Sequence, residues 1–429
     1  MLPVAPTVVD DVRLRRWQAV TGAALLLGYM GYYVCRSNLS VATPALISEF
    51  ANRGVDRQAI GAVSSTGVFF YAIGKLITGV SGDFAGGRTM FLAGLFGSVA
   101  ATVMFGAGSG LAVFVAAWGL NRFVQSAGWG GLVKIASHWF SAKQYGTVMA
   151  VLSLSYLFGD AIGRYVLGAL LSNGATWRML FLIAAAILAL IGVVDVAALR
   201  SSPRDVGCQE PGVNAANVYG AAGAEGTPAN LRDLLLPYVT APSFWLVCGI
   251  SCGLTLIREA FNAWIPTYLV DVHGLSAGRA AQYSSLFPFV GGVSTLAAGF
   301  ASDRVGRGNR IAVAAPCLLL CAASLLALAS TSRSLSGSVW AIIGVAFWLL
   351  GPYSLLAGAV ALDFGGRRGS ATAAGLIDTA GYLGAVLSGF AVGRIVETSG
   401  WPAAFRALAA VAAATLIAAL AYGRRHARS

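Results

Sequence analysis

Long apolar stretches recur along almost the whole chain, and each is long enough to cross a bilayer as a helix. A membrane-spanning helix needs roughly 20 mainly apolar residues. Here 57% of the 429 residues are hydrophobic and only 11% are charged, whereas soluble domains are roughly 45–50% apolar and about 25% charged. The sequence therefore predicts an all-α membrane protein with many spans, and it excludes a soluble domain, a disordered chain and a collagen-like repeat.

Twelve helical spans account for these apolar stretches. A segment containing Gly, Ala and Pro divides them into two sets of six, so we predict an N-terminal six-helix bundle (1–198), a cytoplasmic linker (199–241) and a C-terminal six-helix bundle (242–429). The predicted spans are residues 17–48, 57–80, 88–108, 110–137, 145–172, 177–198, 242–271, 278–301, 310–331, 335–363, 370–398 and 401–422.

The net charge of +12 is distributed unevenly over the predicted connections. Most of their Lys and Arg residues lie in the two terminal segments, the linker and the loops that follow even-numbered spans. Cytoplasmic connections of membrane proteins carry such an excess. We therefore expect a multi-pass protein of the inner (plasma) membrane with both termini in the cytoplasm. The basic charge then reports topology, and we expect no nucleic-acid partner.

A glycine-containing loop pattern occurs twice, at an offset of 220 residues. Glycines let helices approach closely, while a loop Asp or Arg can pair or cap a helix end. The pattern resembles the loop signature of the major facilitator superfamily, whose members are two pseudosymmetric six-helix bundles around a central cavity. This resemblance implies a conformational role for Gly79, Asp83 and Arg88 after the second span, and for Gly299, Asp303 and Arg307 after the eighth.

Nine of the charged residues in the predicted spans are candidates for a functional role. A charge at mid-bilayer costs at least about 2.5–3.5 kcal/mol, so such residues normally face a cavity or a partner. Six of them are basic and three are acidic, and an anionic substrate would balance the positive excess. The basic residues are Arg36, Lys75, Arg122, Lys134, Arg164 and Arg258, and the acidic ones are Asp160, Glu259 and Asp378.

Arg36 and Arg258 are the main candidates for binding this anion. They lie 222 residues apart, close to the offset of the repeated loops, and so occupy corresponding places in the first and seventh spans. Two guanidinium groups can hold one phosphate or carboxylate through charge-assisted hydrogen bonds. Alternatively, each arginine pairs within its own half. Glu259 points about 100° away from Arg258 on a helix, so we expect it to be a poor partner.

Tyrosines accompany these charges at helical spacing. Tyr29, Tyr33 and Arg36 share one helix face, and Tyr71 lies one turn before Lys75. Phenol hydroxyls beside a cation suit a ligand with several oxygens, although tyrosines also pack between helices. The predicted substrate-binding set is Arg36, Arg258, Lys75, Tyr29, Tyr33, Tyr71, Tyr156, Arg164 and Tyr382.

The acidic residues in the spans have two interpretations. Asp160 either neutralises Arg164, four residues later, or acts in proton coupling or substrate binding. Asp378 is either a proton carrier or a counter-ion for Lys134 or Arg258, and Lys134 can also extend its amine to the membrane interface. The candidates for proton coupling or charge balance are Asp160, Asp378, Glu259 and Arg122.

The cysteines indicate no metal or disulfide site. Cys248 with Cys252, and Cys317 with Cys321, are four residues apart inside apolar runs, a spacing typical of small buried residues and unlike that of a zinc site. No nucleophile–base set is present either. We therefore expect no metal, no cofactor, no catalytic residue and no enzymatic activity.

Several segments resemble the organophosphate:phosphate antiporter family, which includes glycerol-3-phosphate and hexose-phosphate exchangers. Residues 28–38 (GYMGYYVCRSN) resemble that family's first helix, and residues 264–269 (WIPTYL), which follow Arg258, resemble its seventh. The resemblance implies that Arg36 and Arg258 bind the substrate phosphate. Further similar positions are Tyr71 with Lys75, residues 125–129 and residues 381–384.

Two features depart from this family or resemble another. Tyr156 stands where the family has a histidine in its fifth helix. The segment 36–40 (RSNLS) also resembles the anion:cation symporter family, which moves sugar acids with protons or sodium. That family usually has acids at the places held here by Cys35 and Trp129, so we rank it second.

The resemblance implies exchange of an organic phosphate ester for inorganic phosphate by alternating access. Bound phosphate would neutralise the two arginines and let the halves close. The alternatives are a proton-coupled sugar-acid symporter and a transporter-like organophosphate sensor. We expect a monomer in the lipid bilayer whose partner is an anionic small molecule, phosphate or an organophosphate.

Overall fold

The computed structural model describes residues 8–212, 214, 217–220, 226–305, 310–330 and 334–426. Over these residues the regular structure is entirely helical, which confirms the predicted all-α class. Within the same residues, nine helices are long and apolar enough to cross a membrane. The first and fourth predicted spans are not among the nine. The fourth contains the buried polar residues Arg122, Gln125 and Lys134, which lower its hydropathy.

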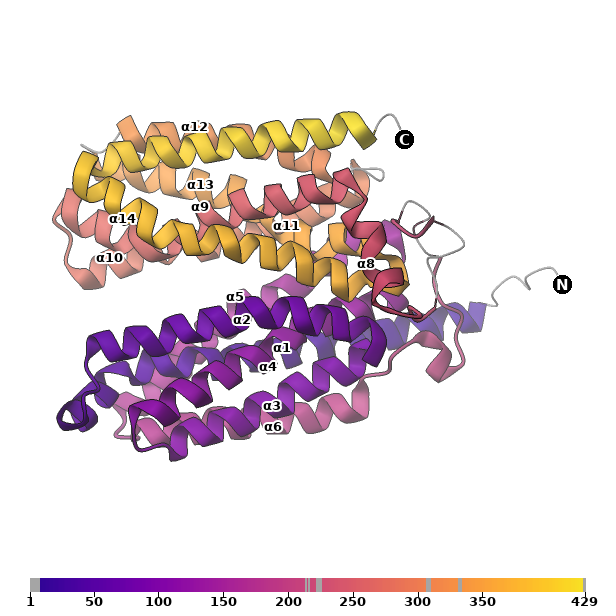
Figure 1. Ribbon diagram of the computed structural model, residues 1–429, viewed down its shortest axis with the longest axis horizontal. Helices are drawn as coiled ribbons and strands as arrows, with labels where there is room; N and C mark the ends of the chain where they lie inside the picture. The colour runs from indigo at the N-terminus through magenta and orange to yellow at the C-terminus, as the bar shows by residue number, and fades with distance from the viewer. Residues whose placement is uncertain are drawn as a thin grey trace. The chain divides into compact units, whose positions relative to one another are not determined.

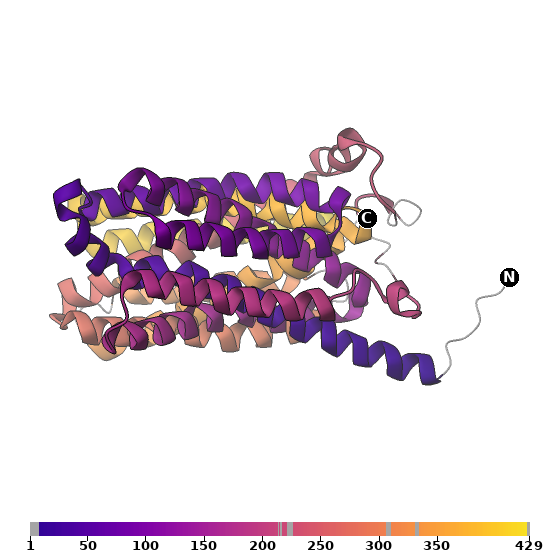
Figure 2. The ribbon, with the colours of Figure 1, turned by 90° about the horizontal axis from the view of Figure 1, so that it is seen from below.

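Six long helices cover the six spans predicted for the first half. Asp56 and Thr176 begin the second and the sixth of them, where each side chain accepts a hydrogen bond from a backbone N–H three residues later. The first turns of α1 extend past the neighbouring helices (Figures 1 and 2). The helices are α1 (Val8–Phe50), α2 (Arg57–Ala85), α3 (Gly87–Ala107), α4 (Leu111–Trp139), α5 (Tyr145–Ser172) and α6 (Trp177–Ala198).

The second half follows two short helical segments in the linker, η3 (Pro203–Val206) and α8 (Leu231–Val239). The ribbon of the final helix reverses direction part-way (Figure 1), where Gly400 has a φ of +79°, a conformation that favours glycine. The element α14 (Ala361–His426) thus covers two predicted spans, one on each side of this reversal. The elements are α9 (Pro242–His273), α10 (Ala277–Ser284), α11 (Leu286–Arg304), α12 (Ile311–Ser330), α13 (Leu335–Leu355), a π-helical turn η4 (Leu356–Val360) and α14 (Ala361–His426).

The chain forms two compact units, and each includes a short segment from the other half of the sequence. Unit 1 contains Met1–Ala142, Val151–Pro228 and Gly365–Gly375. Unit 2 contains Lys143–Ala150, Ala229–Phe364 and Leu376–Ser429. The start of α5 therefore packs in unit 2, and the segment around Gly365–Gly375 packs in unit 1.

Stacked aromatic rings form part of the core of unit 1. The Phe105 ring lies 4.3 Å from that of Phe181 and 4.8 Å from that of Phe114, centroid to centroid. These rings join α3, α4 and α6. Aromatic pairs at such distances add about 0.5–1.5 kcal/mol each to the burial of their apolar surface.

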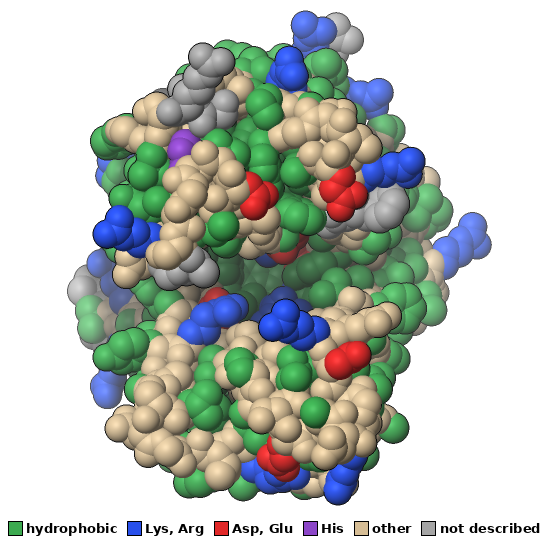
Figure 3. All heavy atoms as spheres, turned by 90° about the vertical axis from the view of Figure 1, so that its left-hand side faces the viewer, with side chains coloured by type: hydrophobic (Ala, Val, Ile, Leu, Met, Phe, Trp, Pro, Cys, Tyr) green, Lys and Arg blue, Asp and Glu red, His purple; other side chains and the backbone are tan. Residues whose placement is uncertain are grey.

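Large apolar side chains also lie on the outer surface of both units. Leu190 on α6 is 69% exposed and Ile417 on α14 is 68% exposed. At one end of the helices, acidic and basic side chains lie among hydrophobic ones (Figure 3). An apolar exterior of this kind is expected where helices face lipid, because the lipid tails replace the protein core as the apolar surroundings.

Candidate functional site

Tyrosines on one face of α1 pack against α4 and α5 within unit 1. The Tyr29 ring lies 5.3 Å from that of Trp129, and the Tyr33 ring lies 6.1 Å from that of Tyr156. Gly128 favours this close packing, because a Cβ at this position would lie 3.0 Å from the Tyr29 ring. The structure therefore brings together the predicted residues Tyr29, Tyr33 and Tyr156, and adds Trp129.

Arg36 continues this helix face into a polar site. Its Nη1 donates a hydrogen bond to the Tyr33 hydroxyl (3.1 Å), and its guanidinium lies over the Tyr33 ring at 4.9 Å. The same guanidinium lies 4.7 Å from the centre of the Tyr71 ring on α2. The predicted Arg36, Tyr33 and Tyr71 thus form one site contributed by two helices.

Two more cations lie over the same Tyr71 ring. The Lys75 ammonium is 5.1 Å from the ring centre, and the Arg122 guanidinium on α4 is 4.4 Å from it. Lys75 is 3% exposed and Arg122 is 4% exposed, and Tyr71 itself is buried. The negative face of an aromatic ring attracts cations and so offsets part of their mutual repulsion. Three basic side chains gathered inside a membrane unit favour an anionic ligand.

Gln125 fixes the position of Arg122. Its side-chain oxygen lies 3.3 Å from Arg122 Nη1, while its amide donates to Ser98 Oγ (3.0 Å) and to the Tyr32 carbonyl (3.3 Å). Arg122 was expected to act in proton coupling or charge balance, not in the substrate-binding set. Its contact with Tyr71 joins α2 to α4, so helical spacing on either helix alone could not show it.

Asp160 and Arg164 form an ion pair with an O–N distance of 2.8 Å. Ser37 Oγ donates to the other Asp160 oxygen at 2.8 Å, so the pair also connects α5 to α1. This geometry agrees with the alternative in which the two side chains neutralise each other. The Arg164 side chain is 56% exposed, and any contact with substrate stays a prediction.

Arg258 has different surroundings in unit 2. Its guanidinium lies 4.5 Å from the centre of the Tyr353 ring, and its Nε donates to Glu259 Oε1 at 2.8 Å. The expectation that Glu259 is a poor partner is therefore wrong. Arginine is long enough to curve around the helix, and the two guanidinium nitrogens Nε and Nη2 reach the same carboxylate oxygen.

Asp378 and Tyr382 lie one turn apart on α14, and both are half-buried. Close contact with α9 positions this part of α14: a Cβ on Gly381 would lie 2.6 Å from Thr255 Oγ1, and Ser251 Oγ donates to the Ile377 carbonyl at 2.9 Å. The structure thus places both residues beside the helix that carries Arg258. Their roles in binding or proton coupling stay predictions.

The loop motif of unit 1 binds backbone groups near the start of α14. Asp83 accepts hydrogen bonds from the N–H groups of Thr372 (2.7 Å) and Ala371 (3.4 Å). Lys134 pairs with Asp83 at 2.8 Å and donates to the Arg367 and Arg368 carbonyls. An acid at backbone N–H groups and a base at backbone carbonyls both complement the helix dipole.

Lys134 therefore does not extend to the membrane interface, as one interpretation of the sequence proposed. Its residue exposure is only 6%, and its counter-ion is Asp83, which is 2% exposed. Gly79 allows the close approach on which this site depends, because a Cβ there would lie 2.9 Å from the Ala371 carbonyl oxygen. Arg88 binds the C-terminal end of α6, through the carbonyls of Val196 (2.8 Å) and Leu199 (2.9 Å).

The second copy of the motif makes an equivalent site in unit 2. Asp303 accepts hydrogen bonds from the N–H groups of Gly146 (2.8 Å) and Thr147 (2.6 Å) at the start of α5. Gly299 lies against the same turn, since a Cβ there would be 2.5 Å from the Gly146 carbonyl oxygen. Arg310 pairs with Asp303 at 2.6 Å. Arg307 lies outside the described residues.

Comparison with known proteins decides the family. Residues 25–389 match the family model described as Major Facilitator Superfamily. The chain belongs to the major facilitator superfamily. The predicted fold class is therefore confirmed, and the structure is similar to the crystal structure of the Escherichia coli fucose:proton symporter FucP, with a TM-score of 0.74 and 13% identity over 94% of this chain and 99% of that one.

Curated relatives align with almost the whole length of this chain. It is 28% identical to a probable hexose phosphate transport protein of Chlamydia pneumoniae, over 94% of this chain and 91% of that protein. It is 26% identical to the membrane sensor protein UhpC of Escherichia coli (94% and 92% covered) and to the glycerol-3-phosphate transporter of Bacillus subtilis (92% and 90%). The expected resemblance is confirmed, and these relatives are transporters or a sensor rather than enzymes.

Glu210 of the linker was not among the predicted site residues, although two arginines and one histidine contact its carboxylate. Its carboxylate lies 3.2 Å from His138 Nδ1, 3.2 Å from Arg204 Nη2 and 2.8 Å from Arg367 Nη1. Burial alone would raise the pKa of Glu210, but the hydrogen bond with His138 and the charges of His138, Arg367 and Arg204 outweigh it and lower that pKa. A linker residue shows no helical or strand periodicity, so no pattern pointed to it.

Asp195 on α6 was also missed. It is 1% exposed, and neither carboxylate oxygen has a hydrogen-bond partner among the described residues. Gly28 on α1 makes room for it, because a Cβ there would lie 2.2 Å from Asp195 Oδ2. A charged carboxylate buried without partners is very unfavourable. The available signal was an acid inside the predicted span 177–198.

Proposed function

We propose that the protein is a secondary active transporter that exchanges an organic phosphate ester, of the sugar phosphate or glycerol phosphate type, for inorganic phosphate. The observation that carries this proposal is the gathering of Arg36, Lys75 and Arg122 around the buried Tyr71 ring. The names of the hexose phosphate and glycerol-3-phosphate relatives support the same substrate class.

Phosphate chemistry fits this site better than carboxylate chemistry. A phosphate group carries more charge than a carboxylate and has three free oxygens, so it can accept hydrogen bonds from Arg36 and Lys75 at once. The Tyr33 hydroxyl holds the Arg36 side chain at 3.1 Å. Arg258, at the corresponding place of the second half, would provide the second guanidinium, and Glu259 would have to share it with the substrate.

Transport would proceed by alternating access. The backbone N–H groups that Asp83 binds in α14, and those that Asp303 binds at the start of α5, would be released and bound again in each cycle, because each acid connects segments from both halves of the sequence. Bound phosphate would lower the repulsion among the cations and permit the change, whereas an empty site would resist it. We infer an inner-membrane location with both termini in the cytoplasm from the basic loops, and we propose a monomer.

Exchange in liposomes tests this function. Protein reconstituted into phosphate-loaded liposomes should take up labelled phosphate or glucose 6-phosphate in exchange for internal phosphate. Arg36→Ala should lower the rate by about 30-fold or more, because it removes a charge-assisted hydrogen bond from the ligand. Arg57→Ala, an exposed arginine at the start of α2, is the control. An unchanged rate in Arg36→Ala would contradict the proposed phosphate site.

A sensor is the second candidate, because UhpC, named a membrane sensor protein, aligns over 94% of this chain. A sensor of the same fold would bind the organophosphate without moving it. Tight binding of glucose 6-phosphate by the purified protein, lost in Arg36→Ala, together with no flux in liposomes would favour this role over exchange.

A further inference from the structure

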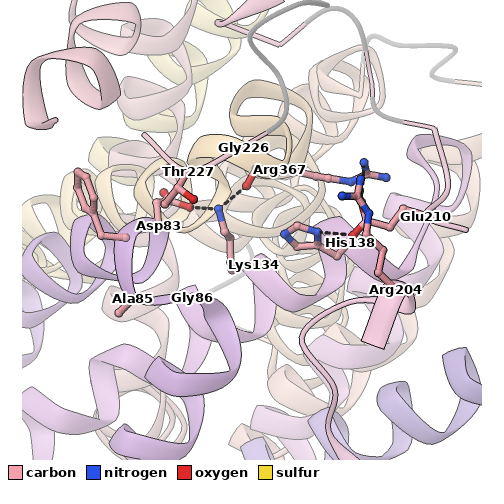
Figure 4. Close-up of a pocket in the computed structure, with 11 residues that line it drawn as sticks. Asp83, Ala85, Gly86, Lys134, His138, Arg204, Glu210, Gly226, Thr227 and Arg367 are labelled. Carbon is pink, nitrogen blue, oxygen red and sulfur yellow. Dashed lines mark hydrogen bonds and ion pairs between the residues drawn. The ribbon is translucent and has the colours of Figure 1, made fainter. Parts of the chain in front are cut away.

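A pocket of about 330 Å³ lies in unit 1 beside the Asp83 site. Asp83 and Lys134 form one part of its wall, and Glu210, His138, Arg204 and Arg367 form another (Figure 4). Pockets that hold small ligands are typically about 300–1,000 Å³. The volume is therefore sufficient for a small anion. None of these residues belongs to the Tyr71 site.

The pocket wall carries an excess of positive charge. Lys134 and Asp83 neutralise each other at 2.8 Å. Among the described residues of the remaining wall, two guanidinium groups and one imidazole face the carboxylate of Glu210. Counted over these described residues, two arginines and one glutamate give this part of the wall a formal charge of +1.

Glu210 occupies the wall as an anion provided by the linker itself. It follows η3, a short segment closed by a capping box between Ser202 and Asp205 and by a left-handed turn at Gly207. Because that segment is held by its own hydrogen bonds, Glu210 can leave the cations without unwinding a membrane helix. His138 and Arg367 come from α4 and from the start of α14, so these two side chains belong to helices rather than to the linker, whereas Arg204 lies in η3.

We propose that this pocket binds a phosphate-type anion in competition with Glu210. The Arg204 and Arg367 guanidinium groups present forked N–H donors that match phosphate oxygens, and His138 adds a third contact. This site is separate from the proposed transport site and goes beyond it. Arg367 also donates to the Pro211 carbonyl. An anion that replaces Glu210 therefore changes what holds the linker to Gly365–Gly375, the segment that Asp83 binds, and so regulates transport.

Binding is tested apart from transport. The full chain carrying Arg36→Ala and Arg258→Ala, which lacks both arginines proposed to bind the transported phosphate, is titrated calorimetrically with inorganic phosphate in detergent. Adding Glu210→Gln should tighten phosphate binding by about tenfold, because the competing charge is gone. Adding Arg204→Ala as well should reverse that gain. Arg232→Ala, which removes an exposed arginine of α8 outside the pocket, should leave the gain intact.

Anionic lipid head groups share the phosphate chemistry, and a second arm separates the two sources. The titrations are repeated in nanodiscs of neutral lipid and of neutral lipid with phosphatidylglycerol. A gain in both discs identifies free phosphate as the ligand, whereas a gain confined to neutral discs means that the lipid head group occupies the pocket. Both results support the proposal.

An unchanged phosphate affinity on Glu210→Gln in detergent and in neutral nanodiscs would overturn the proposal, as would a gain that persists after Arg204→Ala. If the double-arginine background does not purify as folded protein, the same variants in the wild-type background are compared by stoichiometry. Glu210→Gln should then add a second phosphate site that Arg204→Ala removes, and a single site in both variants would overturn the proposal.

Discussion

The two copies of the loop motif bind helix backbone in the same way but balance their charge differently. Asp83 and Asp303 each accept hydrogen bonds from two successive backbone N–H groups. Asp83 then pairs with one lysine from α4, and that pair is almost fully buried. Asp303 pairs with Arg310, which also binds a second acid, Asp363, at 2.5 Å.

This difference shows that both copies of the motif keep an aspartate that accepts from two backbone N–H groups, whereas the residue that neutralises the aspartate differs between the copies. At the Asp83 site one acid and one base neutralise each other, and Lys134 adds contacts to two backbone carbonyls. At the Asp303 site one base serves two acids, so removal of either acid leaves the base paired. The Asp83 site should therefore be much less tolerant of substitution.

Asp83→Ala should give the largest effect. It leaves the Lys134 ammonium buried without its carboxylate, and breaking a buried pair in this way costs about 3–5 kcal/mol. Asp303→Ala leaves Arg310 paired with Asp363, so it should cost only about 1–2 kcal/mol, the value of a lost helix cap. Thermal unfolding in detergent measures both.

The control for this pair is Asp56→Ala. Asp56 also caps a helix, accepting from Ala59 N at 2.7 Å, but no ion pair with it is recorded in the described part of the chain. It should lose about 1 kcal/mol, as a cap alone does. Equal losses of stability for Asp83→Ala and Asp303→Ala would show that the buried Lys134 does not make the Asp83 site less tolerant of substitution.

The site residues that follow a local sequence pattern could be predicted from the sequence. Gly79, Asp83, Gly299 and Asp303 stand at fixed spacing, and the faces of α1 and α2 that carry Arg36 and Lys75 follow from helical periodicity. The membrane fold followed from the long apolar spans. These features depend on residues that are close together in the chain.

Contacts between distant segments could not be predicted in the same way. Lys134 lies near a helix end, where a lysine commonly extends towards water, and only the position of Asp83 shows that it is buried. Arg122 reaches the Tyr71 ring from another helix. Glu210 comes from an irregular segment. Each of these side chains has a partner more than 40 residues away in sequence.

Substitution of the motif glycines should destabilise the protein less than Asp83→Ala does. In this case the site in unit 2 should be the less tolerant of the two. A Cβ on Gly299 would lie 2.4 Å from the Ala150 Cβ and 2.5 Å from a backbone oxygen, whereas one on Gly79 would lie 2.9 Å from its nearest atom. Gly299→Ala should therefore destabilise by about 1–3 kcal/mol, as overpacking does, and Gly79→Ala by less.

Two controls make the glycine result specific. Gly61→Ala, on the same helix as Gly79 with open space around it, should be neutral or stabilising by about 0.5–1 kcal/mol, because alanine restricts the unfolded chain. Ala150→Gly in the Gly299→Ala background should recover part of the loss. Gly79→Ala costing more than Gly299→Ala would mean that the unit 2 contact relaxes more easily than its distances indicate.

The smallest effect should be the contribution of Glu210 to the pH dependence of the protein's stability. The hydrogen bond with His138 and the nearby charges hold the Glu210 pKa below its ordinary value despite burial. A group whose folded pKa is lowered stabilises fully above its unfolded pKa, about 4.3 for glutamate, and loses that contribution as the pH falls through the folded value. The wild-type protein should therefore be more stable than Glu210→Gln at pH 7, by at most about 1 kcal/mol. The difference in melting temperature should shrink as the pH is lowered from about 5 to about 3.5.

Arg232→Ala, measured over the same range, should keep a constant difference from wild type. If the Glu210→Gln difference also stays constant to the lowest pH, the carboxylate charge of Glu210 does not hold the linker, and the linker is attached by other contacts such as that between Arg367 and the Pro211 carbonyl.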